Sequence, residues 1–171
     1  MRKIITALAL AACCLMAAAP TFANEPVQNN KEEQQMTQEF STVFPTGAKN
    51  DAYAQYFVGQ SYLNMLSLEQ VVIGNVTFEP GCRNNWHIHH ADKGGGQILL
   101  VTGGRGYYQE WGKEPRELHP GDVVNIPAGV KHWHGAAPTS WFAHLAVEVP
   151  GENTRSEWCE PVDAKEYNAL K

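Results

Sequence analysis

Positive charge, cysteine and long apolar runs are all scarce in this chain of 171 residues. Lysine and arginine total 13 against 18 acidic residues, which gives a formal net charge of −5 without any basic cluster. We therefore expect neither nucleic acid nor an anionic membrane as a partner. The sequence contains no internal repeat, and its length suits one domain with a core of its own.

The one long apolar run lies at the N-terminus, where Arg2 and Lys3 precede residues 4–19. Small residues then surround Phe22, so the pattern predicts that residues 1–23 are a secretory signal peptide. The run is short for a membrane span. We expect an exported bacterial protein, periplasmic or extracellular. In the alternative, the "LAAC" of residues 10–13 resembles a lipobox, and lipidation at Cys13 would attach the chain to a membrane.

Only four cysteines occur, and a signal peptide would remove Cys13 and Cys14. Cys82 and Cys159 remain, and in an oxidising compartment they can form a disulfide. The alternative is two separate free cysteines, because the sequence does not give the distance between them.

Residues 24–39 are polar and amide-rich, which predicts a disordered linker before a single domain at 40–171. That domain is rich in short β-branched and aromatic runs separated by Gly, Pro and Asn, a pattern typical of an all-β sandwich or barrel. The glycines of residues 102–106 predict a hairpin turn, residues 107–117 a solvated hairpin, and residues 162–171 a short helix. The predicted strands lie in residues 52–59, 70–80, 97–104, 105–112, 122–129 and 141–149.

All seven histidines fall between residues 87 and 144. His87 and His89 are two residues apart, as are His132 and His134, so on strands the members of each pair point to the same face. Two such pairs brought face to face inside a barrel would form an imidazole cluster suited to Mn, Fe, Ni, Cu or Zn. The alternative is a histidine core held together by hydrogen bonds. His119 precedes Pro120 at a turn, where we expect it to be exposed.

Two motifs make this pattern more specific. Residues 81–89 (GCRNNWHIH), with Gln97 and then Gly103-Gly104, resemble the first cupin motif, with glutamine where glutamate is usual. Residues 121–132 (GDVVNIPAGVKH) resemble the second cupin motif. The resemblance implies a cupin double-stranded β-helix, a jelly-roll barrel with a short C-terminal helix and a metal-binding core at residues 70–150. The implied metal ligands are His87, His89, Gln97 and His132.

Longer stretches, such as "KHWHGAAPTSWFAHLA" at residues 131–146, are similar to small bacterial single-domain cupins. These are the manganese-dependent hydroxynitrile lyases and the cupin domains related to carboxymuconolactone decarboxylase fusions. The resemblance implies one divalent ion, manganese in that group, with Fe, Zn, Ni or Cu left open. It also implies a small-molecule substrate and a homodimer.

The same resemblance bears on two further histidines. It implies that His144, on the last barrel strand, acts as the base. His134 could be a fifth ligand, a hydrogen-bond partner of a ligand or a pocket wall, and we expect it to line the pocket. His144 and His134 are therefore the catalytic candidates.

Charge counting favours one class of reaction. Three imidazoles and a neutral amide leave the +2 charge of a metal ion uncompensated, which strengthens its Lewis acidity and disfavours higher oxidation states. We therefore predict a lyase-type enzyme that polarises a substrate hydroxyl or carbonyl. The argument fails if Asp92 folds inward as a carboxylate. The alternatives are a metal-dependent dioxygenase and a non-catalytic metallo-cupin that binds a sugar or another small molecule.

Residues 90–96 separate the first histidine pair from Gln97 and contain three glycines. They are either a surface extension or a lid in which His90, Asp92 or Lys93 reaches the substrate and the glycines act as the hinge.

Overall fold

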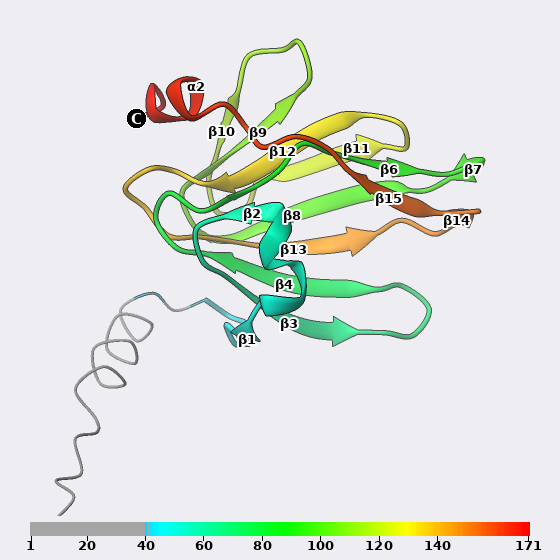
Figure 1. The fold of residues 1–171 in the computed structure, drawn as a ribbon. Coiled ribbons are helices and arrows are strands. Elements are labelled where there is room, and N and C mark those ends of the chain that lie inside the picture. The colour runs from blue at the N-terminus through cyan, green and yellow to red at the C-terminus, as the bar shows by residue number, and fades with distance from the viewer. Residues whose placement is uncertain (1–39, 41) are drawn as a thin grey trace, which may run out of the picture.

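A computed structural model describes residues 40 and 42–171 (Figure 1). The predicted signal peptide, the predicted linker and Cys13 lie outside these residues. In the described part of the chain, no helix has the length and apolar character needed to span a membrane.

The structure consists mainly of short β-strands, as the sequence predicts. Its N-terminal half contains β1 (Ala48–Lys49), the 3-10 helix η1 (Asp51–Tyr56), β2 (Phe57–Val58), β3 (Ser61–Ser67), β4 (Ile73–Phe78), β5 (Arg83–Asn84), β6 (His87–His90), β7 (Lys93–Gly94) and β8 (Gly96–Gly104). Its C-terminal half contains β9 (Gly106–Glu110), β10 (Arg116–Leu118), β11 (Val123–Pro127), β12 (Lys131–Ala136), β13 (Phe142–Glu148), β14 (Gly151–Glu152), β15 (Arg155–Trp158) and the helix α2 (Ala164–Asn168).

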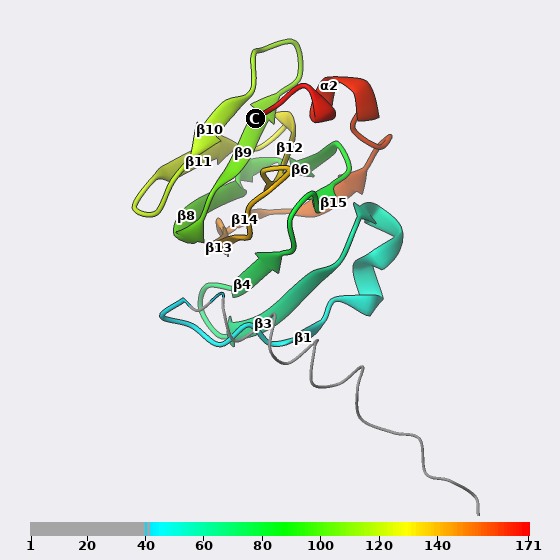
Figure 2. The same ribbon diagram turned by 90° about the vertical axis from the view of Figure 1, so that its left-hand side faces the viewer.

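Two antiparallel sheets form the barrel. The first has the strand order β1-β3-β4-β13-β8-β11. The second has the order β10-β9-β12-β5-β2, and β6 joins it between β12 and β15. Figure 2 shows the β9–β10 hairpin on the side of the barrel opposite β1 and β3. Because the chain crosses between the sheets several times, as from β10 to β11, β12 and β13, side chains from distant parts of the sequence meet in the interior.

The core lies between the sheets and follows the two-residue period of the strands. In β11, for example, Val124 and Ile126 are buried while Val123 and Asn125 are exposed. Phe78 is fully buried in the same cluster. This alternation decides which residues of each strand can reach an internal site.

The C-terminal helix covers one end of the barrel. Its predicted position is confirmed, although the regular part is five residues long. The Asp163 side chain accepts hydrogen bonds from the backbone N–H groups of Lys165 and Glu166, which caps the helix. The buried Tyr167 hydroxyl donates to the carbonyl of Ala136 at 2.6 Å and fastens the helix to β12.

Two local predictions are wrong. Residues 52–56 of the segment predicted as a strand belong to the 3-10 helix η1 (Asp51–Tyr56), and only Phe57 and Val58 are extended. The predicted hairpin at residues 102–106 does not form, because β8 pairs with β11 and β13 whereas β9 pairs with β10 and β12. Gly104 has a φ of +69°, and a Cβ there would lie 1.9 Å from the Trp141 carbonyl oxygen. The glycine permits this close approach where the chain crosses between sheets.

The solvated hairpin predicted at residues 107–117 is confirmed as β9 and β10. Strand β3 was not among the predicted strands. Cys82 is buried and Cys159 is partly buried, and both are free thiols, so the disulfide alternative is not formed.

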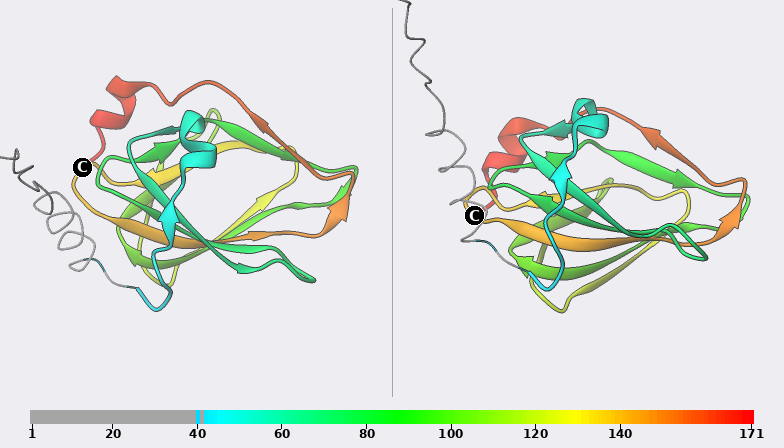
Figure 3. Two further views of the ribbon diagram at one scale, coloured as in Figure 1. Left: turned by 60° about the horizontal axis from the view of Figure 1, so that its bottom comes forward. Right: turned by 90° about the horizontal axis from the view of Figure 1, so that it is seen from below.

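The segment at residues 90–96 is tied to the chain that follows β13. β7 pairs with β14, and Figure 3 shows these two strands at the end of the barrel away from α2. Asp92 accepts a hydrogen bond from Asn153 at 2.7 Å, and Lys93 forms an ion pair with Glu152. His90 lies 2.7 Å from a carboxylate oxygen of Glu157. All three side chains proposed to reach the substrate therefore have partners in residues 152–157.

Candidate metal centre

The two histidine pairs lie side by side in one sheet. β6 and β12 are hydrogen-bonded neighbours, with His87 directly opposite His132. The expectation that the pairs face one another across the barrel is therefore wrong, although it is correct that both pairs point inward. His87, His89, His132 and His134 are all buried.

The histidines are close enough to share one ion. Ligand atoms of His87, His132 and His134 lie within 4.8 Å of one another. The ring centre of His89 lies 5.2 Å from that of His87 and 5.6 Å from that of His132. The residues thus form a single cluster of four imidazoles, and two of them, His89 and His134, compete for the third place beside His87 and His132.

Backbone carbonyls orient His87 and His132. The Nδ1 atom of His87 lies 3.0 Å from the carbonyl oxygen of Asn85, and that of His132 lies 2.9 Å from the carbonyl oxygen of Val130. A carbonyl only accepts, so each Nδ1 carries the proton and each Nε2 keeps a free lone pair. The Nε2 of His132 is buried and has no hydrogen-bond partner.

Side chains orient His89 and Gln97. The Gln97 amide nitrogen donates to Glu148 at 2.7 Å, and the His89 Nδ1 lies 3.3 Å from the other carboxylate oxygen. Three acceptor atoms of the predicted ligand set are consequently buried without a partner: His89 Nε2, Gln97 Oε1 and His132 Nε2. Partnerless buried acceptors are costly unless a cation or donor occupies the space they face, so the donor set fits a divalent metal ion.

His134 has different surroundings. The Asn84 amide nitrogen lies 3.3 Å and 3.1 Å from its two ring nitrogens, and the Asn84 oxygen accepts the backbone N–H of His134. Its Nδ1 also lies 3.1 Å from the Nε2 of His144. The ring nitrogens of His134 therefore already have partners, unlike the free Nε2 of His89.

His144 lies behind His134. It is fully buried and does not line the adjacent cavity, whereas His134 does. The 3.1 Å contact between His134 and His144 links His144 to the cavity.

Burial sets the protonation state of four histidines at this site: His87, His132, His134 and His144. It lowers the pKa of His87 and His134 well below the ordinary value, and neighbouring histidines lower both further. It lowers the pKa of His132 and His144 to about 4. At neutral pH these imidazoles are uncharged, which is the form that binds a metal ion.

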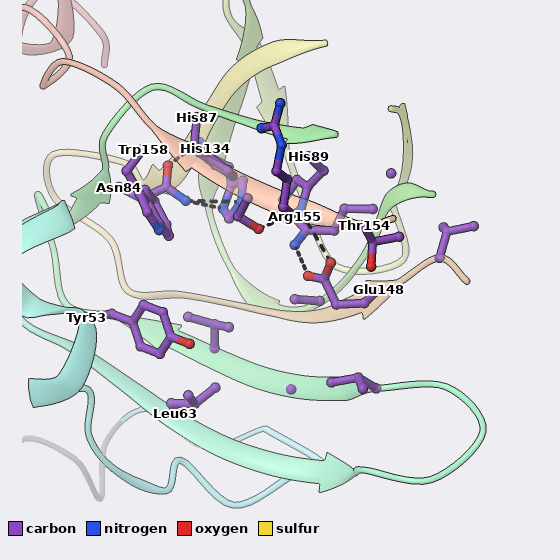
Figure 4. A pocket seen from close by; sticks show the side chains of 18 of the residues that line it. Tyr53, Leu63, Asn84, His87, His89, His134, Glu148, Thr154, Arg155 and Trp158 are labelled. Carbon is purple, nitrogen blue, oxygen red and sulfur yellow. Dashed lines mark hydrogen bonds and ion pairs between the residues drawn. The ribbon is translucent and has the colours of Figure 1, made fainter. Parts of the chain in front are cut away.

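A cavity of about 570 Å³ opens beside the cluster. His87, His89, Gln97 and His134 line one side, and apolar side chains such as Leu63 line the other. Figure 4 shows Tyr53 and Leu63 across the space from His134 and Glu148. A cavity of this size, apolar with a few convergent polar groups, suits a small organic molecule.

Aromatic rings close the cavity near β15. The ring of Trp158 stacks on His87 at 4.8 Å between centres, and Tyr56 stacks on Trp158 at 4.5 Å. η1 contributes Tyr56, so the segment wrongly predicted as a strand helps to enclose the site.

Sequence reasoning missed two residues of this site. They are Glu148 and Asn84. The signal for Glu148 is its position four residues after His144, which places both on the inner face of β13. Asp92, considered as an inward carboxylate, instead binds Asn153 at the surface.

Comparisons with known proteins agree with this geometry. Residues 74–145 match the Cupin domain family. Over 93 residues the chain is 46% identical to a protein of Granulicella tundricola named (R)-mandelonitrile lyase, and the match covers 54% of this chain and 68% of that one. A solved structure of a cupin-like protein from Thermotoga maritima superimposes with a TM-score of 0.66 at 36% identity. That superposition covers 77% of this chain and 98% of the other.

Proposed function

We propose that this chain, which belongs to the cupin superfamily, is a lyase of the hydroxynitrile class that holds one divalent metal ion at His87, His89, Gln97 and His132. The cupin fold and the cluster of His87, His132 and His134 support a metal-dependent cupin. The lyase activity is proposed because a relative at 46% identity is named (R)-mandelonitrile lyase.

The proposed ligands are chosen because their acceptor atoms are available to a metal ion. His89 Nε2, Gln97 Oε1 and His132 Nε2 have no other partner, and the tautomer of His87 also leaves its Nε2 available. When bound, the ion would supply Lewis acidity toward a substrate hydroxyl oxygen. Manganese is proposed from the family resemblance alone.

The remaining residues suit the cleavage of a cyanohydrin. His134 lines the cavity in neutral form, and its Nε2 can accept the hydroxyl proton of the substrate when the Asn84 amide, 3.1 Å away, gives up its contact with that atom. As that proton leaves, the hydroxyl carbon becomes a carbonyl, and the bond to the nitrile carbon breaks with its electron pair leaving as cyanide. His144 Nε2, 3.1 Å from His134 Nδ1, can accept a hydrogen bond from the charged ring. Leu63 and Val76 supply an apolar wall for an aryl group.

The test is turnover of (R)-mandelonitrile by metal-loaded protein under anaerobic conditions, with benzaldehyde as the measured product. We expect the His132→Ala variant to be inactive. We expect the wild type to lose activity when its metal is removed and to regain it when metal is added back. A protein that binds metal but releases no benzaldehyde without oxygen is not a lyase of this class. Elemental analysis of protein purified from its own compartment identifies the metal.

The position of Glu148 strengthens the dioxygenase alternative. The charge argument for a lyase assumes no carboxylate near the ligands, yet Glu148 contacts both Gln97 and His89. The negative charge beside the site weakens that argument. Oxygen consumption coupled to substrate loss would identify a dioxygenase, and metal binding with neither reaction would identify a non-catalytic binder.

We also propose an exported homodimer, on the N-terminal sequence pattern and the family resemblance respectively. N-terminal sequencing of the native protein should find the chain starting at Asn24, or a lipidated Cys13. Light scattering of the purified protein should give twice the mass of one processed chain.

A further inference from the structure

Glu148 occupies a position between two proposed metal ligands. It lies at the end of β13, directly opposite Gln97 on β8. One carboxylate oxygen accepts the Gln97 amide N–H at 2.7 Å, and the other lies 3.3 Å from His89 Nδ1 (Figure 4). Each oxygen therefore serves a different ligand.

The carboxylate determines which atoms of those ligands remain free. Because Glu148 takes the amide nitrogen of Gln97, the amide oxygen is left as the free end of that side chain, and it is buried without a partner. Because an ionised carboxylate can only accept, His89 carries its proton on Nδ1 and keeps a lone pair on the buried Nε2. Both free atoms are the ones a metal ion would need.

The second neighbour of His89 cannot fix this tautomer by itself. The Ser156 hydroxyl lies 3.3 Å from Nδ1, but a hydroxyl both donates and accepts. Glu148, by contrast, meets two side-chain nitrogens with its two carboxylate oxygens, and a carboxylate with both oxygens engaged in this way can only accept. Of the two neighbours of His89 Nδ1, Glu148 is therefore the one that favours a proton there.

We propose that Glu148 is the positioning residue of the metal centre, orienting Gln97 and His89 and supplying beside the ligands the negative charge that Gln97 lacks within them. The first cupin motif usually has a glutamate carboxylate among the ligands. Here the carboxylate instead belongs to Glu148 on the neighbouring strand β13. This inference rests on the proposed metal site.

Glu148→Gln is the direct test, because it keeps the side-chain shape and removes the charge. Glutamine has one acceptor oxygen, so it cannot accept from Gln97 and His89 together. We expect metal-free Glu148→Gln to show the His89 proton moved from Nδ1 to Nε2 in nitrogen NMR of the imidazoles. We also expect Mn²⁺ and Zn²⁺ titrated calorimetrically into the metal-free protein to bind about 10- to 100-fold more weakly than in the wild type.

The exchange variant Gln97→Glu/Glu148→Gln separates positioning from general damage. In this variant the amide introduced at position 148 can donate to the carboxylate introduced at position 97, while the amide oxygen accepts from His89. Both contacts are thus restored with the same total charge, and we expect the metal affinity to return at least to the wild-type value. The matched control is Glu157→Gln, which breaks a comparable contact with His90 outside the cluster and should leave affinity within about twofold.

The outcomes separate this inference from the proposed function. If Glu148→Gln keeps the wild-type tautomer and affinity while His132→Ala loses metal, Glu148 has no positioning role and the metal site stands. If His132→Ala also binds metal normally, the proposed site itself is wrong. If the exchange variant binds no better than Glu148→Gln, the hydrogen-bond geometry is not what matters and the inference is overturned.

Discussion

The two histidine pairs share one spacing but are held in different ways. The first member of each pair, His87 or His132, donates to a backbone carbonyl two residues earlier in the chain. The second member, His89 or His134, depends on side chains from other strands: Glu148 for His89, and Asn84 with His144 for His134. Local backbone thus orients half of the cluster, and long-range side-chain contacts orient the other half.

The largest expected effect comes from removing a first member. His132→Ala should weaken metal binding by at least about 100-fold and abolish activity, since it deletes a ligand whose Nε2 has no other role. Elemental analysis after dialysis measures the loss. The control is His119→Ala, which alters an exposed histidine and should keep full metal content. Full metal content in His132→Ala would show that the first members are not ligands.

The same comparison predicts that His89 is needed for metal binding, whereas His134 is needed for the reaction. His89→Ala should lose metal, whereas His134→Ala should retain it and turn over about 100-fold more slowly, as expected for loss of a proton acceptor. Metal content and kcat measured on the same samples decide this. If His134→Ala loses metal and His89→Ala keeps it, the ligand set is His87, His132 and His134 instead.

Neutral histidines should also make the metal-free protein sensitive to acid. The folded-state pKa of His132 and of His144 is about 4, against an ordinary 6.5, so between these values the unfolded chain binds more protons than the folded one. Stability should therefore fall as the pH drops through this range, by on the order of 3 kcal/mol for each of the two histidines.

Urea unfolding of the metal-free wild type between about pH 7 and pH 4 measures that fall. The variant His144→Gln should show a smaller fall, and His119→Ala the full one. A profile that is flat over this range would mean that the cluster is protonated when folded.

The smallest effect is expected at residues 90–96, the segment that follows the first histidine pair. Lys93→Ala removes an exposed ion pair with Glu152 and should change the free energy of unfolding by less than about 1 kcal/mol, with metal content and substrate range unchanged. Replacing residues 90–96 by a tight turn is the stronger form of the test. A changed substrate range at constant metal content would support the lid interpretation, which is consistent with His90 lining the cavity.

The sequence could predict features that depend on local patterns, but not those that depend on contacts between distant residues. The two-residue spacing placed both histidine pairs on inward faces, and the motif resemblance gave the fold. The role of Glu148 depends on a contact across 51 residues of sequence, and no local pattern specifies that register. The aromatic run at residues 52–59 favoured a strand, but residues 52–56 lie in a 3-10 helix in which Tyr56 packs on Trp158.

The place of β6 between β12 and β15 has a consequence for assembly. The strand that carries the first histidine pair gains its last neighbour only when residues 155–158 pair with it, close to the end of the chain. Pairings between such distant segments form late, since loop closure must precede any gain from contacts. Glu148 and Trp158 likewise reach the cluster from the final quarter of the sequence. A growing chain therefore contains its histidines before it can hold them in place, so the proposed metal site would be complete only in the finished barrel.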